Sequence, residues 1–257
     1  MKKFLILAIA FTVSGVLFAQ NYRVMQWNIQ IGIDMNDRYN LRRQAEVILA
    51  QDPDVVALNE VDFNCERTNF QDQTKILATL CGMYSQFGGR RALRLNGLSG
   101  NAILSRFPIK LIGTWQIPHI VEIVRSCTIC LISAPEPFYV VVTHLSARQT
   151  PEGELIRIEA LKRIFELVEQ YASDYPVILV GDLNSKYGSA PIQFLEKDWA
   201  LAGHEKTWRA DNPTQELDYF AVRKSDAAKI KVVKHEVIDE KIASDHRPVV
   251  TVVEVAK

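Results

Sequence analysis

Two short polar clusters in this chain carry residue types that could do hydrolytic chemistry. The first, Gly181-Asp182-Leu183-Asn184-Ser185, directly follows the apolar run 177–180. The second, Ser244-Asp245-His246-Arg247-Pro248, directly precedes the apolar run 249–253. Loops beside rigid strands often carry catalytic groups. Carboxylates, an amide and an imidazole could supply metal ligands, a base and a phosphate clamp, which together are the equipment for metal-assisted hydrolysis of a phosphate ester.

Ten apolar segments have the length and composition of strands, and they must position these clusters. Their ranges are 22–28, 55–58, 101–104, 109–117, 129–133, 138–143, 177–180, 217–222, 230–237 and 249–255. Three other segments, at 41–50, 71–80 and 151–171, have the periodicity of helices. Strands interspersed with long helices predict sheet layers that are covered by helices.

The segment 151–171 is the clearest predicted helix. Thr150 can cap its first turn, and Pro151 suits the first helical position. We expect one apolar stripe of this helix to face the core. That stripe consists of Leu155, Ile158, Leu161, Ile164, Phe165 and Val168.

Polar residues stand at or near the ends of several predicted strands. They are Asn28, Glu60, Asn101, His144, Asp182, Asn184, Asp218, Asp245 and His246. A single Asp or Asn at a strand end is usually a turn residue. If these ends converge in space, however, their side chains build one cleft.

Seven motifs that occur in this order resemble those of a known family. They are Trp27-Asn28-Ile29, Asn59-Glu60-Val61, Gly100–Arg106, Thr143-His144-Leu145, Gly181–Asn184, Leu217-Asp218-Tyr219 and Ser244–Pro248. Together they are similar to the endonuclease/exonuclease/phosphatase superfamily with its DNase I-like fold, over roughly residues 22–255. The resemblance implies an α/β (α+β) fold, a four-layer sandwich of two packed mixed β-sheets flanked by helices. It also implies one domain over residues 20–257, in a secreted bacterial branch of metal-dependent hydrolases.

The resemblance implies catalytic roles for residues at the matching positions. Asp182 would orient or deprotonate the attacking water, and Asn184 would hold a phosphate oxygen. His246 would donate a hydrogen bond to the phosphoryl oxygen and so stabilise the charge that develops there. Asp218 would orient His246, as carboxylates behind a catalytic imidazole do. His144 would make a second contact to the phosphate.

The resemblance also implies a divalent metal in the same cleft, usually Mg²⁺, with Mn²⁺ as the alternative. Glu60 would be the main ligand, because a hard cation prefers carboxylate oxygen. Asn28 would ligate or support the metal beside it, and Asp245 would face it. Asn59 departs from the family pattern, in which Gln often precedes the acidic ligand, so the support around Glu60 is expected to differ.

Asn101 and Arg67 are the candidate substrate-binding residues. Asn101 would position its neighbours in the cleft, or it would only tie down a loop. Arg67 could bind a substrate phosphate through its guanidinium fork. It could equally pair with Asp62 or Glu66, and we regard this pairing as slightly favoured.

The formal net charge of the 257-residue chain is zero, so a strong basic footprint for nucleic acid is absent. A local basic loop does occur at Arg90, Arg91 and Arg94. Such a loop is usually only solvated. The functional alternative is a rim that grips a phosphodiester or an anionic head group.

The N-terminus has the pattern of a secretory signal peptide. Lys2 and Lys3 precede the apolar stretch 4–18, which is short for a membrane span. We expect residues 1–19 to be removed, with export to the periplasm or the extracellular space and no stable membrane span after processing. An uncleaved membrane anchor is the alternative.

Four cysteines, Cys65, Cys81, Cys127 and Cys130, would permit disulfides in an exported protein, with three possible pairings. Cys127 and Cys130 also have the spacing of a redox motif. They lie in an apolar run with no Trp, Gly or Pro between them, however. This setting favours two cysteines buried in a strand.

Three hypotheses about function follow. The favoured one is an exported Mg²⁺-dependent phosphoesterase, acting on a small molecule or a lipid head group by in-line attack of an activated water. The second is an exported endonuclease or exonuclease that cleaves DNA or RNA. The third is an inactive binding module on the same fold, which the occupied motif positions disfavour. We expect the protein to be a monomer.

Overall fold

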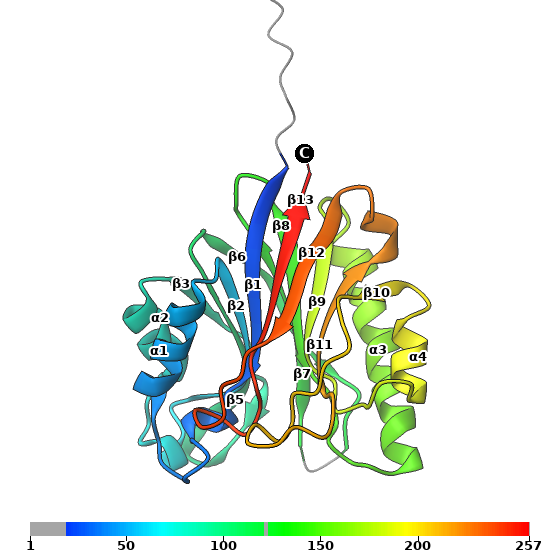
Figure 1. The fold of residues 1–257 in the computed structure, drawn as a ribbon. Helices are drawn as coiled ribbons and strands as arrows, with labels where there is room; N and C mark the ends of the chain where they lie inside the picture. Colours follow the sequence, from blue (N-terminus) through cyan, green and yellow to red (C-terminus); the bar gives the residue numbers. More distant parts are fainter. Residues whose placement is uncertain (1–18, 121–122, 257) are drawn as a thin grey trace, which may run out of the picture.

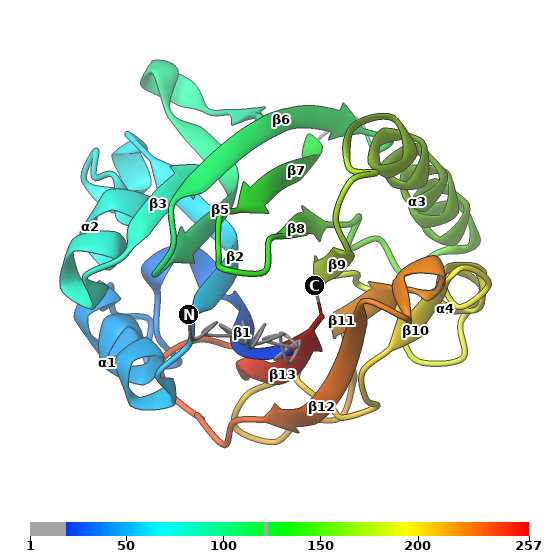
Figure 2. The same ribbon diagram turned by 90° about the horizontal axis from the view of Figure 1, so that it is seen from above.

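The computed structural model describes residues 19–120 and 123–256. Within these ranges two β-sheets pack face to face, and helices cover the outer side of each (Figures 1 and 2). The first sheet has the order β12-β13-β1-β2-β5-β3, with β4 also paired to β5. Its strands are β1 (Gln20–Asn28), β2 (Val55–Phe63), β3 (Tyr84–Phe87), β4 (Arg91–Ala92), β5 (Leu98–Ser105), β12 (Ile230–Val237) and β13 (Val249–Val255).

The second sheet has the order β10-β11-β9-β8-β7-β6. Its strands are β6 (Ile109–Ile117), β7 (Arg125–Ile132), β8 (Phe138–His144), β9 (Val177–Asp182), β10 (Trp199–Leu201) and β11 (Asp218–Arg223). The helices are α1 (Leu41–Gln51), α2 (Gln73–Cys81), α3 (Pro151–Tyr171) and α4 (Ala190–Leu195). Both sheets are mixed, because β1 pairs with β2 and β8 pairs with β9 in parallel while the other strand pairs are antiparallel.

The alternation of side chains along the strands divides the buried residues among three cores. In β1, Val24 faces the opposite sheet and shares a core with Val140 and Val180. The next residue, Met25, points the other way and packs in the core that includes Ile48 of α1. The third core lies between the second sheet and the helices α3 and α4. The predicted four-layer sandwich of two mixed sheets is confirmed.

Helix α3 occupies the predicted range, but one edge of its predicted apolar stripe is wrong. The side chain of Thr150 caps the helix by accepting a hydrogen bond from the backbone N–H of Gly153. Leu161, with other residues of its face, is buried. Leu155, however, is 64% exposed, and Arg157 is buried instead. Nη1 of Arg157 donates to the backbone oxygens of Ser146 and Arg148, which partly satisfies this charged group on the inner face.

Strand β2 is longer than the sequence predicts, because a bulge interrupts its pairing without ending it. The register between β2 and β5 shifts between Leu58 and Val61, and Glu60 has a φ of 55°. Pairing then resumes as far as Phe63. The expected end of the strand at Asn59-Glu60 is therefore wrong, and this turn-like dipeptide lies inside the strand. The short elements β3, β4, α4 and β10 were not predicted.

The ends of several strands meet at one end of the sandwich. Asn28 at the end of β1 lies beside Asn59 in β2, through parallel pairing. In the second sheet, parallel pairing sets His144 beside Asp182, and antiparallel pairing sets Asp218 on the other side of Asp182. Because the two sheets pack against each other, these ends form one polar cluster.

The four cysteines all lie in the described part of the chain and are free thiols. Cys127 packs against the α3 side of the second sheet, whereas Cys130 lies in the core between the sheets. Residues three apart in a strand face opposite ways, so the redox interpretation of this pair is wrong and the buried-strand interpretation is confirmed. Burial raises the pKa of the Cys130 thiol to about 12 and that of Cys81 to about 11.

The predicted signal segment, residues 1–19, lies outside the described residues except for Ala19. Among the helices that the structure describes, none combines the length and the apolar character needed to cross a lipid bilayer.

Candidate active site

Asp182 lies at the centre of the polar cluster. Its Oδ2 atom is 3.3 Å from Nε2 of His144 and 3.7 Å from Nε2 of His246. The same oxygen accepts a hydrogen bond of 3.1 Å from Nδ2 of Asn28. The Oδ1 atom accepts from the backbone N–H of Asn184 at 2.9 Å. Four predicted site residues from separate parts of the chain therefore contact one buried carboxyl group.

The glycine before Asp182 is required by the close approach of β8. Gly181 has a φ of 147°, which side chains other than glycine rarely adopt. A Cβ atom at this position would lie 1.8 Å from the backbone oxygen of Thr143. The conformation of Gly181 thus allows Asp182 to sit directly beside His144.

His246 and Asp218 form a buried pair, with Nδ1 of His246 2.7 Å from Oδ2 of Asp218. Burial alone would lower the pKa of His246, but the carboxylates of Asp218 and Asp182 raise it to about 10. Burial opposes ionisation of Asp218, yet the charge of His246 and hydrogen bonds from His246, Thr207 and Gln26 hold the pKa of Asp218 below its ordinary value. His246 is therefore an imidazolium at neutral pH, and its Nε2–H points toward Asp182.

Asp182 and His144 differ in protonation from the His246–Asp218 pair. Burial raises the pKa of Asp182 to about 7, with a further rise from Asp218 and opposing effects of His246, Asn184 and Asn28. Burial also lowers the pKa of His144 well below its usual value. The charges of Arg125, His246 and Arg91 add to that lowering. His144 is consequently neutral at neutral pH. Asp182, with a pKa of about 7, is suited to accept a proton at this pH.

Asn184 is held against His144. Its Nδ2 atom lies 3.0 Å from Nε2 of His144 and donates to the backbone oxygen of Leu145 at 3.2 Å. The backbone of Asn184 has a φ of 48°, a left-handed conformation that Asn tolerates better than most residues. The structure thus brings Asn184 beside the His144–Asp182 pair.

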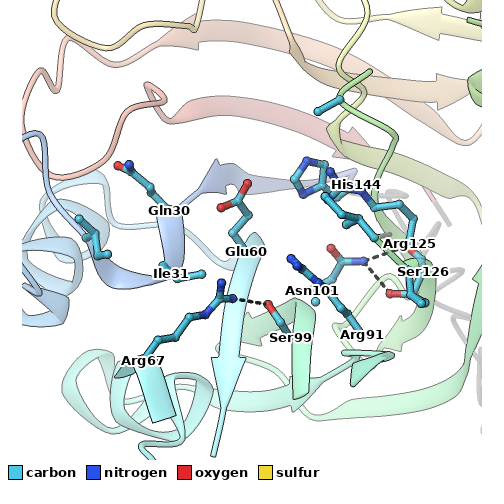
Figure 3. A pocket seen from close by; sticks show the side chains of 15 residues that line it. Gln30, Ile31, Glu60, Arg67, Arg91, Ser99, Asn101, Arg125, Ser126 and His144 are labelled. Carbon is cyan, nitrogen blue, oxygen red and sulfur yellow. Dashed lines mark hydrogen bonds between the residues drawn. The ribbon is translucent and has the colours of Figure 1, made fainter. Parts of the chain in front are cut away.

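Glu60 stands on the bulge of β2 and extends toward the cleft (Figure 3). Its carboxylate accepts a hydrogen bond of 3.2 Å from Nδ2 of Asn28, so one amide group joins Glu60 to Asp182. A positive φ at a residue with a long side chain costs free energy, and such conformations cluster at functional sites. Bulges also redirect side chains near active sites.

Two sets of residues could hold a cation. Asp182, Asp218 and His246 offer ligand atoms that lie within 4.8 Å of one another. Oδ2 of Asp218 already accepts hydrogen bonds from Thr207 and His246, however, and a protonated imidazole is a poor ligand. The second set is Glu60 with the neighbouring Asn28.

The Glu60 side of the cleft fits a hard cation better. The Glu60 carboxylate is half-buried and, among the described residues, has no Lys or Arg within 4.0 Å to neutralise it. The amide nitrogen of Asn28 is used by the two carboxylates, and its Oδ1 accepts from the backbone N–H of Gln30. Asn28 therefore supports Glu60 more directly than it offers a free ligand atom. Asp245, which directly precedes His246, is half-buried, and its Oδ2 accepts a hydrogen bond from the indole of Trp208 at 3.3 Å.

A cavity of about 340 Å³ opens beside this cluster. Glu60, Asn101, His144 and Arg67 are among the residues that line it (Figure 3). Asn101 is fixed by the protein, because its Oδ1 accepts from Asn59 and its Nδ2 donates to the backbone oxygen of Ser126. It therefore positions its neighbours and also forms part of the cavity wall.

Arg67 makes the pairing that the sequence analysis favoured. Its guanidinium donates two hydrogen bonds of 2.7 Å to the carboxylate of Asp62, and a third of 3.3 Å to Ser99. The Asp62 carboxylate neutralises Arg67, although the arginine still borders the cavity.

The arginines of the basic loop take different positions. Arg91 lies in β4 and lines the cavity. Arg90 donates to the backbone oxygen of Thr114, and Arg94 is exposed in a short 3₁₀ turn. The interpretation as a simple solvated loop is thus wrong for Arg91.

Sequence reasoning assigned no site role to two residues that shape the site. Asn59 links the two sheets: its Oδ1 accepts from the backbone N–H of Asp182 and from Gln26, and its Nδ2 donates to Asn101 and to the backbone of Thr143. Its place beside Glu60 was the available signal. Arg125 lines the cavity at the start of β7, before the predicted strand at 129–133, and nothing in its sequence surroundings marks it.

Trp27 is fully buried and contributes indirectly to the site. Its Nε1 donates a hydrogen bond of 2.9 Å to the backbone oxygen of His246. The hydroxyl of Ser244 donates to the backbone oxygen of Asn28 at 2.7 Å. Both bonds tie the His246 loop to the end of β1.

Comparisons with known proteins agree with this geometry. The model of the Endonuclease/Exonuclease/phosphatase family matches residues 25–246. The chain is 28% identical over 174 residues to the uncharacterized protein YbhP of Escherichia coli (strain K12), covering 64% of this chain and 67% of that protein.

Solved structures share the fold. The crystal structure of an endonuclease/exonuclease/phosphatase from Beutenbergia cavernae DSM 12333 has a TM-score of 0.73 at 24% identity, covering 91% of this chain and 72% of that one. The family protein from Bacteroides thetaiotaomicron has a TM-score of 0.73 at 15% identity, covering 93% and 99%. Because the family model matches most of the chain, residues 25–246, the chain belongs to the Endonuclease/Exonuclease/phosphatase family.

Proposed function

We propose that this protein is an exported, Mg²⁺-dependent phosphoesterase that hydrolyses a phosphodiester or a phosphomonoester by in-line attack of water. The observation that carries the proposal is the position of Asp182 between two histidines that differ in protonation state. One of them, His246, is cationic at neutral pH, and the other, His144, is neutral. A base beside a fixed hydrogen-bond donor suits attack on an anionic phosphate.

In this mechanism Asp182 accepts the proton of the attacking water. Its pKa of about 7 leaves a large fraction ionised at neutral pH. His246 donates from Nε2 to a phosphoryl oxygen as negative charge develops on it. Asp218 holds His246 in orientation and stabilises its positive charge. Asn184 and His144 contact the remaining phosphate oxygens.

Glu60, with Asn28 hydrogen-bonded to its carboxylate, would hold the cation, and Asp245 is a further candidate ligand. Bound Mg²⁺ would polarise a phosphoryl oxygen and neutralise charge in the transition state. Carboxylate and amide oxygens are the ligands that Mg²⁺ prefers.

A direct displacement by water needs no nucleophile from the protein. The nearest hydroxyl in the motif belongs to Ser185, which donates to the backbone oxygen of Leu183 at 2.9 Å. Among the described residues no histidine or carboxylate contacts this hydroxyl, so Ser185 lacks the base that activates a serine nucleophile.

The N-terminal pattern of residues 1–19 is the support for export. Expression of the full chain with a periplasmic fractionation, followed by mass spectrometry of the N-terminus, tests it. Export predicts a processed chain that begins at residue 20 in the periplasm or the medium. Full-length protein in the cytoplasmic fraction would contradict this part of the proposal.

The function is tested by hydrolysis of a substrate panel by residues 20–257 with Mg²⁺. The panel contains bis-p-nitrophenyl phosphate, p-nitrophenyl phosphate, inositol phosphates, sphingomyelin, single-stranded and plasmid DNA, and RNA. His246→Ala protein, prepared in parallel, controls for contaminating hydrolases. Turnover of small or lipid esters that the variant lacks would support the phosphoesterase. Cleavage of nucleic acid alone, lost in the variant, would instead identify a nuclease.

A further inference from the structure

Two arginines other than Arg67 line the cavity. Arg91 in β4 and Arg125 in β7 both border it (Figure 3). Neither forms an ion pair within 4.0 Å with any acid in the described ranges. The Nε atom of Arg125 is shielded from solvent and, in the same part of the chain, meets no hydrogen-bond acceptor. Arg67, by contrast, is neutralised by two hydrogen bonds to Asp62.

The positions of these arginines follow from strand pairing. β4 pairs with β5 so that Arg91 lies opposite Ser99, two residues before Asn101. Arg125 directly precedes Ser126, whose backbone oxygen accepts from Asn101. Figure 3 shows Arg91 and Arg125 with Asn101 and Ser126, across the cavity from Gln30 and Arg67. The basic part of the cavity therefore lies beside the Glu60–His144 centre.

Within the described ranges, no carboxylate within 4.0 Å balances the positive charge of Arg91 and Arg125. Burial lowers the pKa of Arg125, the carboxylates of Glu60 and Asp182 oppose this effect, and the charge of Arg91 lowers the pKa further. Two cations in a confined space, with a donor that has no acceptor, are unfavourable until an anion joins them. A phosphate group accepts several charge-assisted hydrogen bonds from guanidinium groups in the required geometry.

We propose that Arg91 and Arg125 form a subsite for a second phosphate group of the substrate, adjacent to the phosphate that is hydrolysed. The inference rests on the proposed function and narrows its substrate class to phosphate esters that carry a second phosphate close to the scissile one. The cavity volume of about 340 Å³ suits a small ester or the end of a longer chain. The two arginines are then residues that determine specificity, distinct from the groups that contact the reacting atoms.

Matched ligands that differ by one phosphate test this subsite. The first pair is thymidine 3′-monophosphate and thymidine 3′,5′-bisphosphate, with their 3′-p-nitrophenyl esters as substrates. The second pair is inositol 1-phosphate and inositol 1,4-bisphosphate, which separates a sugar phosphate source from a nucleotide source. Calorimetry measures binding in the presence of Mg²⁺, and release of nitrophenol or phosphate measures turnover.

In at least one pair, the wild-type protein is expected to bind the bisphosphate about tenfold tighter than the monophosphate, or more, and to show a similar difference in KM. Arg125→Gln and Arg91→Gln should remove most of this preference, with a larger loss for the bisphosphate than for the monophosphate. Arg125→Lys, which keeps the charge but not the fork, should retain part of it. Arg90→Gln is the matched control, since Arg90 contacts Thr114 outside the cavity, and should retain the full preference.

The outcomes separate the subsite from the proposed function. A binding preference without turnover would support the subsite and contradict the phosphoesterase. Turnover without any preference for a second phosphate would do the reverse. Equal losses for both members of a pair in Arg125→Gln and Arg91→Gln would show that the arginines act on the scissile phosphate itself and would overturn the subsite. Thermal melting of each variant shows whether a loss comes only from unfolding. If Arg125→Gln unfolds, Arg91→Gln, on the short edge strand β4, decides whether the subsite exists.

Discussion

Nδ1 of His246 lies 2.7 Å from Oδ2 of Asp218, and both side chains are almost completely buried. The pair joins the loop before β13 in the first sheet to the first residue of β11 in the second. The Asp218 carboxylate is held from three sides, because it accepts hydrogen bonds from His246, Thr207 and Gln26. The imidazole that the mechanism needs as a donor is thus fixed across the interface between the two sheets.

Replacement of Asp218 by Asn should disable His246 without removing it. The variant loses the carboxylate that raises the pKa of His246, so this pKa should fall from about 10 toward its ordinary value. We expect kcat to fall about 100-fold or more, because the donor is then neither charged nor oriented. Steady-state kinetics and an NMR titration of the imidazole measure the two effects.

The control for this variant is Asp211→Asn, which changes an exposed acid on a neighbouring loop. It should leave both quantities unchanged. Wild-type kcat in Asp218→Asn would show that the pair is structural only.

Asn59 should contribute strongly to stability. In Asn59→Ala, the backbone N–H of Asp182 and the amide of Gln26 lose an acceptor, and Oδ1 of Asn101 loses a donor. Unsatisfied buried polar groups each cost about 1–3 kcal/mol, so the free energy of unfolding should fall by roughly 3 kcal/mol. Urea denaturation measures this change. Asn212→Ala, at an exposed position, should stay within about 0.5 kcal/mol of wild type. A similarly small effect for Asn59→Ala would contradict its role as the link between the sheets.

Glu216 should make the stability of the fold depend on pH. Burial first, then the nearby acids Glu205, Glu196 and Asp218, raise its pKa from 4.5 to about 8. Between these two values the folded protein binds a proton that the unfolded chain releases, so stability is lost as the pH rises through this window. Glu216→Gln is neutral in both states and should not suffer this loss.

The advantage of Glu216→Gln over wild type in the free energy of unfolding should therefore grow by roughly 2 kcal/mol from about pH 5 to about pH 8. Urea denaturation at several pH values measures it. Glu46→Gln, which changes an exposed acid on α1, is the control. Parallel stability curves for wild type and Glu216→Gln across this range would contradict the prediction.

Local patterns predicted sheet layers covered by helices, whereas the two-sheet sandwich and the centre of the site were implied by the resemblance of seven motifs to a known family. Helix α3 and strands β12 and β13 have the predicted ranges, since long periodic segments carry a strong signal. Strand-end polar residues such as His144, Asp182 and His246 were recognisable as motifs, and the two-sheet packing brings them together.

What the sequence did not reveal depends on pairing between distant segments. Arg125 enters the cavity because β7 begins earlier than its apolar run, and that extension is set by pairing with Ile117 in β6. Strand β4 has only two residues and exists through its contact with β5. Leu155 has the spacing of the apolar stripe of α3. It lies near the start of the helix, however, and its side chain is 64% exposed there. Asn59 reads as a turn residue, but the bulge keeps it inside a strand.

The most direct test of the central claim is the rate at which residues 20–257 hydrolyse the best ester of the panel, for wild type and for Asp182→Asn, with Mg²⁺ and with EDTA. We expect a wild-type rate that EDTA abolishes and that added Mg²⁺ or Mn²⁺ restores. In Asp182→Asn we expect a loss of about 100-fold or more, with a native circular dichroism spectrum. Full activity in Asp182→Asn, or hydrolysis that resists EDTA in protein shown to be free of metal, would contradict the central claim.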